Sequence, residues 1–190
     1  MITEYNDEKH EYRINNIVIP GVTSILQAAG LYDDSFFTEE SRNRGKYVHK
    51  ACLYHLQNDL NENTIPDEYR GYIEAFKRFM DESDCKPHLD RCEVPLFHTK
   101  ECWAGTPDIC GTLNNISMVL DIKTGQQNKT ASYQLAAYQI LLAVNGYEAI
   151  NRFALYLKSN GRYNLIQHKD RHDKNIFHAA LTIFNARKCL

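Results

Sequence analysis

Residues 107–123 read Pro-Asp-Ile-Cys-Gly-Thr-Leu-Asn-Asn-Ile-Ser-Met-Val-Leu-Asp-Ile-Lys, and this stretch decides the fold. Asn114-Asn115 separates two apolar segments. The pair predicts a two-residue turn, because Asn tolerates the positive φ that tight turns require. The stretch is therefore expected to be a β-hairpin in which Leu113 faces Ile116.

The register of this hairpin brings two carboxylates together. Counting back from the turn places Asp108 opposite Asp121. Facing Cβ atoms lie roughly 4.5–5.5 Å apart, and like charges at that separation repel each other. A divalent cation is the simplest compensation. Strand alternation puts Lys123 on the same face as Asp121. The opposite face points into a core and carries Met118, Leu120 and Ile122. The hairpin thus predicts a metal site with a lysine beside it.

The rest of the chain alternates helical and strand patterns. Predicted helices cover 22–29, 38–60, 67–82, 131–144 and 170–188. Predicted strands cover 92–98, 105–113 and 116–123, and tight turns predict hairpins over 10–19 and over 152–158 with 162–168. This order indicates an α/β fold with a restriction-endonuclease-like core, a central mixed β-sheet flanked by α-helices. Because no repeat or linker divides the chain, residues 1–190 are expected to form a single domain.

Composition excludes several classes of protein. No run of roughly 18 apolar residues could span a membrane, so no membrane partner is expected. The N-terminus is acidic and lacks the apolar stretch of a signal peptide, which predicts a cytoplasmic protein. The net charge of −2 argues against broad coating of nucleic acid. It leaves room for a local cleft in which bound metal supplies positive charge.

Four short motifs carry a family resemblance. Pro107-Asp108 followed by Asp121–Lys123 resembles the signature of the PD-(D/E)xK nuclease superfamily. Gly45–His49 resembles the Gly-x-x-x-His motif of its RecB-like exonuclease branch, and Gln134–Tyr138 resembles the Gln-x-x-x-Tyr motif of that branch. The order and rough spacing agree, and the resemblance runs from about residue 40 to 145.

Asp108 and Asp121 are the first expected metal ligands. Solvated strand-end carboxylates are the alternative, but the face-to-face register disfavours it. The resemblance adds the backbone carbonyl of Ile122 as a further ligand. Such an oxygen-rich site suits Mg²⁺ or Mn²⁺ better than zinc.

His49 is the third expected metal ligand. It shares a helical face with Cys52, Leu53 and Leu56 and therefore points inward, a pattern also typical of a core histidine. Gly45, four residues earlier, is expected to permit close approach of the helix, and the motif favours the ligand role. One imidazole among oxygen ligands tilts the preference towards Mn²⁺.

Lys123 and Glu93 are expected to act beside the metal. An ammonium at Lys123 can stabilise a developing phosphorane and orient the attacking water. The resemblance makes it the catalytic lysine, and the alternative is a surface lysine at a strand end. Glu93 is expected to begin a strand and resembles the extra acidic residue that some relatives use near the metal. A solvated glutamate is the alternative.

Four residues are expected to contact DNA. Gln134 and Tyr138 share a helical face, and their motif implies that they line the DNA channel or brace Lys123, although an aromatic at this spacing is usually core. Lys129 and Thr130 precede that helix, whose N-terminus attracts phosphate. A basic edge is also expected, formed by Arg42, Arg44 and Lys46. The alternative is that this run of charges is simply solvated.

The six cysteines are scattered without a Cys-x-x-Cys pair. Some RecB-like nucleases hold an iron–sulfur cluster with four cysteines, three of them near the C-terminus. Only Cys189 lies in that region here, so no iron–sulfur cluster is expected. The cysteines are expected to be free thiols packed as small apolar groups.

The sequence therefore predicts a Mg²⁺- or Mn²⁺-dependent deoxyribonuclease. The resemblance implies an exonuclease of phage or mobile-element recombination and repair, with DNA as substrate and a single-strand annealing or recombination protein as partner. Two alternatives remain open at this stage. One is a non-catalytic nucleic-acid-binding or inhibitor module with the same fold, and the other is an endonuclease of the same superfamily.

Overall fold

The computed structural model describes residues 1–32 and 38–188. Its centre is a five-stranded sheet in the order β10-β9-β8-β7-β4. The strands are β4 (Cys85–Pro87), β7 (Ile109–Leu113), β8 (Ile116–Lys123), β9 (Asn151–Leu157) and β10 (Tyr163–Gln167). The sheet is mixed, because β8 and β9 are parallel and every other neighbouring pair is antiparallel. The predicted α/β class is confirmed.

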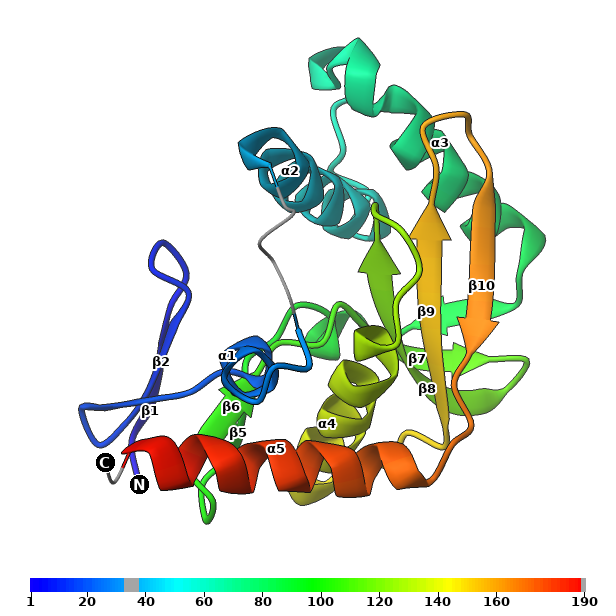
Figure 1. Cartoon of the computed structure of the whole chain (residues 1–190). Coiled ribbons are helices and arrows are strands. Elements are labelled where there is room, and N and C mark those ends of the chain that lie inside the picture. Colours follow the sequence, from blue (N-terminus) through cyan, green and yellow to red (C-terminus); the bar gives the residue numbers. More distant parts are fainter. Residues whose placement is uncertain (33–37, 189–190) are drawn as a thin grey trace.

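Helices cover both faces of this sheet (Figure 1). One face packs on α2 (Glu39–Leu56) and α3 (Asp67–Glu82). The other packs on α4 (Thr130–Val144), which α1 (Val22–Ala28) and α5 (His172–Lys188) cover in turn. Two short 3₁₀ helices lie in connecting segments: η1 (Glu62–Thr64) between α2 and α3, and η2 (Leu89–Arg91) between β4 and β5. No helix in the described part of the chain is long and apolar enough to cross a membrane.

Two smaller sheets accompany the central one. The first contains β1 (Thr3–Asn6), β2 (Glu11–Ile14) and β3 (Ile17–Ile19). The second pairs β5 (Leu96–His98) with β6 (Trp103–Gly105). Figure 1 shows β1 and β2 extending away from the central sheet as an arm, with α1 between them and the rest of the fold.

The predicted register of the β7–β8 hairpin is confirmed. Leu113 pairs with Ile116, and the ladder continues to Ile109 and Leu120. Asn114 and Asn115 have φ values of 52° and 61°, the positive values that the turn was expected to require. Asp108 precedes β7 by one residue, so it continues this register just beyond the last paired residues.

The core lies on both faces of the sheet. Met118, Leu120 and Ile122 pack with α2 and α3, as the alternation predicted. On the other face, α4 is apolar almost all round because it is buried between the sheet and α5. This crossover helix connects the parallel strands β8 and β9.

Two predicted strands have different bounds. The expected strand 105–113 is interrupted at residues 106–108, so that β6 joins the small sheet and β7 joins the central one. Pro107 has no N–H to donate to a ladder, which favours a break there. Of the expected strand 92–98, only residues 96–98 form a strand, which is β5. Cys92 and Glu93 lie in a turn.

Other predicted bounds also shift. The long helix ends at Leu56 rather than residue 60, because Asn58 adopts a left-handed φ of 58°. The last helix begins at His172, two residues later than expected. The short strands β1 and β4 were missed in the sequence, since their pairing partners are not visible in a local pattern.

Most of the described cysteines are small buried groups. Cys52, Cys85, Cys92 and Cys110 are buried free thiols, as expected, whereas Cys102 is exposed. Cys189 lies outside the described residues.

Candidate active site

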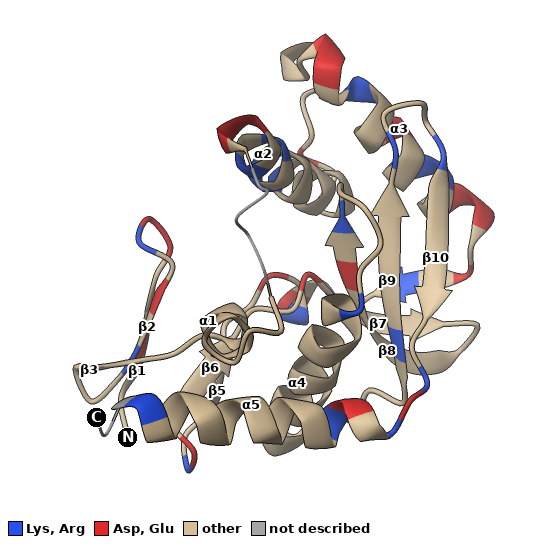
Figure 2. Ribbon diagram, in the orientation of Figure 1, with Lys and Arg blue, Asp and Glu red and all other residues tan. Residues whose placement is uncertain are grey.

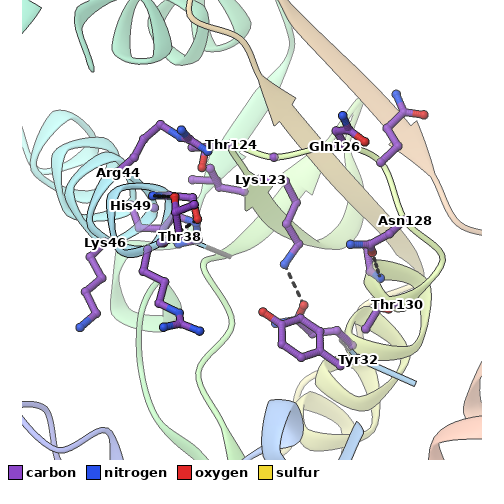
Figure 3. A pocket seen from close by; sticks show the side chains of 18 residues that line it. Tyr32, Thr38, Arg44, Lys46, His49, Lys123, Thr124, Gln126, Asn128 and Thr130 are labelled. Atoms are coloured by element: carbon purple, nitrogen blue, oxygen red, sulfur yellow. Dashed lines mark hydrogen bonds between the residues drawn. The ribbon is translucent and has the colours of Figure 1, made fainter. Parts of the chain in front are cut away.

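A cleft of about 760 Å³ opens between α2 and the segment that follows β8. One wall is the first part of α2, and the other is loop 124–128 with the first turn of α4. Figure 3 shows His49 projecting from α2 and Lys123 from the end of β8. The cleft therefore lies beyond the carboxyl end of a central strand, the edge at which α/β sheets commonly bind ligands.

His49, Glu93 and Asp108 form a group that could hold a metal ion. Their candidate ligand atoms all lie within 4.8 Å of one another. His49 Nδ1 lies 3.3 Å from Asp108 Oδ1 and 3.8 Å from Glu93 Oε1. Asp108 is buried, whereas the side chains of His49 and Glu93 are 29% and 28% exposed. The group is therefore open to solvent on one side.

Asp108 also connects the two strands of the hairpin. Its Oδ2 accepts a hydrogen bond of 2.6 Å from the backbone N–H of Ile122. This bond fixes the carboxylate while Oδ1 remains near His49. Ile122 lines the cleft, and the ligand role of its carbonyl remains a prediction.

Asp121 lies deeper than Asp108 and is only 1% exposed. Its Oδ2 lies 2.7 Å from Lys123 Nζ, so this buried carboxylate is ion-paired with the lysine. Burying a carboxylate is unfavourable unless its charge is paired, and a divalent cation beside Asp108 and Asp121 would add to the pairing that Lys123 supplies. The carboxylates of Asp121, Asp108 and Glu93, together with one imidazole, form a donor set that fits a hard divalent cation such as Mg²⁺ or Mn²⁺.

The charges of the group perturb one another. Burial alone would lower the pKa of His49, but Asp108 and Glu93 raise that pKa well above its usual range. Burial raises the pKa of Asp121 to about 6, opposed by Lys123 and reinforced by Asp108. Burial would also raise the pKa of Asp108, but the positive charges of His49 and Lys123 lower it. Without a cation, a proton on His49 therefore balances part of the negative charge.

Glu93 reaches this group from a turn and not from a strand, which corrects the prediction. Its φ is 55°, a left-handed value that is uncommon outside glycine. Its backbone N–H donates to the carbonyl of Pro107 at 2.9 Å, which holds the turn against the residue before Asp108. This contact joins residues that are distant in the sequence, and it brings the Glu93 carboxylate to His49.

Gly45 does not serve close helix packing, which corrects a second expectation. A Cβ at this position would have no neighbour within 4 Å. Gly45 instead lines the cleft one turn before His49. The absence of a side chain there leaves the approach to His49 open.

Lys123 is held by a chain of hydrogen bonds that continues into α4. Its Nζ donates to Gln134 Oε1 at 2.8 Å, and Gln134 Nε2 donates to the Tyr138 hydroxyl at 2.9 Å. Tyr138 is buried, whereas Gln134 lines the cleft. Burial would lower the pKa of Lys123, but Asp121 and Asp108 raise it. Of the two roles anticipated for this pair, the geometry corresponds to bracing the ammonium.

Replacing Gln134 with leucine should reduce turnover without disturbing metal binding. The substitution removes the acceptor that orients Lys123 and keeps a side chain of similar length. Measured on the DNA cleavage that the sequence predicts, kcat is expected to fall about tenfold, the order of one hydrogen bond to a charged group, with KM little changed. Gln139→Leu, further along α4, is the control, because its amide binds the carbonyl of Ile150. A change in KM as large as the change in kcat, or an unchanged kcat, would contradict the bracing role.

The first turn of α4 faces the cleft, but its residues differ in position. Thr130 lines the cleft, and its hydroxyl donates to the carbonyl of Leu31 at 2.6 Å. Lys129 is exposed at the N-cap and is not among the residues lining the cleft. Asn128 accepts a hydrogen bond of 3.2 Å from the N–H of Ala131. The geometry therefore favours Thr130 over Lys129 as a cleft residue.

The predicted basic edge borders the same cleft. Figure 2 shows that α2 carries acidic residues in its first turn and basic residues after it. Arg42, Arg44 and Lys46 all line the cleft, so the edge is part of the site's wall. Despite the net charge of −2, this wall offers local positive charge to a phosphate backbone.

A buried polar group that the sequence did not reveal anchors the first turn of α4. Arg152 Nη2 lies 3.1 Å from Asp173 Oδ2, and Arg152 Nη1 donates to the carbonyl of Ser132. The Ser132 hydroxyl donates to Asp173 Oδ1 at 3.1 Å. These contacts join β9, α5 and the helix that carries Gln134. The available signal was an arginine at the start of an apolar strand, since a buried charge needs a partner.

Comparison with known proteins supports the fold. No family model and no curated protein matches this chain in sequence. The chain is similar to a solved protein of Eubacterium rectale described as a candidate exonuclease, with a TM-score of 0.53 and 12% identity over 86% of this chain and 71% of that one. It is also similar to an alkaline exonuclease of Laribacter hongkongensis, with a TM-score of 0.47 and 11% identity over 88% and 86% of the two chains. The first likeness shows that this chain has the mixed α/β fold of that structure.

Proposed function

We propose that this chain is a divalent-metal-dependent deoxyribonuclease that acts as an exonuclease. The observation that carries the proposal is the meeting of His49, Asp108, Asp121 and Lys123 beside one cleft with a basic wall. The carboxylates and imidazole suit a hard cation, and the basic wall suits phosphates. Fold likeness alone would leave the activity open.

The metal would be held by Asp108, Asp121 and His49 together with the backbone carbonyl of Ile122. Glu93 is close enough to His49 and Asp108 to complete the set. A bound Mg²⁺ or Mn²⁺ would polarise the scissile phosphate and lower the pKa of a coordinated water. The burial of two carboxylates, Asp108 and Asp121, at one end of the hairpin supports this assignment.

Lys123 is assigned the second chemical role. Its ammonium lies beside Asp121, where it can neutralise charge that develops on the phosphate oxygens and orient the attacking water. Gln134 and Tyr138 keep the ammonium in place. Thr130 and the helix N-terminus behind it would receive a neighbouring phosphate, with Lys129 adding charge from outside the cleft.

The finer identity rests on the motif resemblance. It supports the RecB-like branch and a role in phage or mobile-element recombination or repair, with a single-strand annealing or recombination protein as partner. The description of the Eubacterium rectale structure agrees with an exonuclease. In this proposal the 190 residues act as a single nuclease domain.

The test is a time course on end-labelled DNA. Linear and circular substrates, single-stranded and double-stranded, are incubated with Mg²⁺, Mn²⁺ or a chelator. We expect progressive shortening of linear DNA that requires metal and spares circles. Cleavage of circles would favour an endonuclease. No cleavage with either metal would overturn the proposal in favour of a nucleic-acid-binding or inhibitor module.

Metal affinity should rise with pH. A cation competes with protons, and here it must displace one from His49, whose pKa is raised, and from Asp121, whose pKa is about 6. Below pH 6 both groups are protonated, so affinity should fall by about tenfold per pH unit for each proton released. Calorimetric titration of Mn²⁺ between pH 5 and 8 measures this. A pH-independent affinity would place the cation elsewhere.

A further inference from the structure

The arm formed by β1–β3 carries an aromatic cluster on one face. Tyr5 and Tyr12 are cross-strand partners whose ring centroids lie 4.8 Å apart. His10 contacts both rings edge-on, at 5.7 and 5.6 Å. The Tyr5 hydroxyl and His10 Nδ1 are 2.6 Å apart and share a hydrogen bond. The cluster is therefore a fixed arrangement of rings.

The members of this cluster differ in exposure. Tyr12 is 3% exposed, and its hydroxyl lies 2.9 Å from the Thr106 hydroxyl, two residues before Asp108. Tyr5 is only half-buried and His10 is exposed. The inner ring thus anchors the arm next to the metal site, and the two outer rings are left for another molecule to contact.

The pKa values of the two outer rings are shifted chiefly by burial, with smaller contributions from charges on neighbouring elements. Burial raises the pKa of Tyr5, with smaller contributions that include the carboxylate of Glu93. Burial also lowers the pKa of His10. The carboxylate of Asp7 raises this pKa, and the positive charge of Lys46 lowers it. The geometric link between the arm and the site is the contact of Tyr12 with Thr106, and Lys46 lines the cleft on α2. Figure 3 shows Lys46 extending away from the other cleft side chains.

We propose that Tyr5 and His10 form a stacking site for unpaired nucleobases of a single-stranded DNA segment that enters the active site. The proposal rests on the proposed nuclease function and names the form of its substrate. Aromatic side chains bind single strands by stacking on base faces, which a duplex keeps covered. Basic residues beside such rings bind the phosphates of the same strand. The arm supplies the rings, and α2 supplies the basic residues Arg42, Arg44 and Lys46 that line the cleft.

Binding to base-bearing and abasic oligonucleotides of equal length tests this directly. The two share the same phosphates, so charge affects both alike. Fluorescence anisotropy with Ca²⁺ in place of Mg²⁺ measures affinity. The full chain should bind the base-bearing strand more tightly. Tyr5→Ala/His10→Ala should lose about tenfold or more on that strand, the order of one stacked base, and nothing on the abasic strand.

Matched variants separate stacking from folding. Tyr5→Phe keeps the ring and should bind as the unmodified chain does. Val18→Ala lies in β3 opposite Arg13, on the other face of the arm, and should have no effect. If thermal unfolding shows that the double alanine variant is destabilised, Tyr5→Leu keeps apolar bulk without a π-face and should still lose base-dependent binding.

The outcomes distinguish the two proposals. Equal loss on both oligonucleotides, or no preference of the unmodified chain for bases, overturns the stacking site even when DNA is cleaved. A base preference that depends on Tyr5 and His10, in a chain that cleaves no DNA with Mg²⁺ or Mn²⁺, supports the stacking site and overturns the nuclease.

Discussion

Replacing Lys123 with alanine is expected to lower DNA cleavage by at least about a hundredfold, the scale on which one stabilising contact to a developing oxyanion contributes. The substitution removes the ammonium that lies 2.7 Å from Asp121 and leaves every proposed ligand in place. Metal affinity should therefore survive, or rise slightly, because a nearby positive charge has gone. Single-turnover cleavage and calorimetric Mn²⁺ titration measure the two effects.

Met118→Ala is the matched control for this variant. Met118 lies on β8, as Lys123 does, but its side chain points into the core that α2 and α3 cover, where it is 1% exposed. It should lower the free energy of unfolding by about 2–5 kcal/mol and leave the chemistry of the folded fraction unchanged. If Lys123→Ala cleaves DNA at nearly the unmodified rate, the lysine only balances the charge of Asp121 and has no catalytic role.

Replacing Asp108 with asparagine is expected to abolish cleavage almost completely. The change keeps the shape of the side chain and its ability to accept the hydrogen bond from Ile122, but removes the negative charge beside His49. Loss of this proposed metal ligand should reduce cleavage by about a thousandfold or more, since metal catalysis contributes several kcal/mol. Mn²⁺ affinity should fall with it.

A second readout of the Asp108 variant does not depend on activity. Asp108 is the largest of the contributions that raise the pKa of His49 against burial, so this pKa should fall in the asparagine variant. NMR titration of the imidazole without metal measures the change. Asp90→Asn, whose side chain is 72% exposed in η2, is the control and should alter neither pKa nor cleavage. An unshifted His49 would show that the two groups are not coupled.

The parts of the site that the sequence predicted are those set by local rules. The Asn114-Asn115 turn fixes the hairpin, and strand alternation then fixes which residues face the core. One helical turn separates Gln134 from Tyr138, so their hydrogen bond is also a local consequence. Each of these steps needs only the neighbouring residues.

The parts that could not be predicted depend on distant contacts. Glu93 reaches His49 because its backbone bonds to Pro107, and its left-handed φ has no sequence signal. The break at residues 106–108 follows from β6 pairing with β5. Gly45 was misinterpreted because a glycine in a helix has the same pattern whether it faces a neighbour or an open cleft.

Parallel pairing of β8 with β9 makes the complete candidate site a late product of folding. The β7–β8 hairpin closes through two residues, whereas β8 meets β9 only after α4 has crossed the sheet. Non-local pairings form slowly, because the entropy of loop closure must be overcome before the new contacts compensate for it. During synthesis Asp121 and Lys123 emerge before the helix that steadies them. An unfinished chain can therefore bring Asp108 and Asp121 together in the hairpin before Gln134 is in place to hold Lys123.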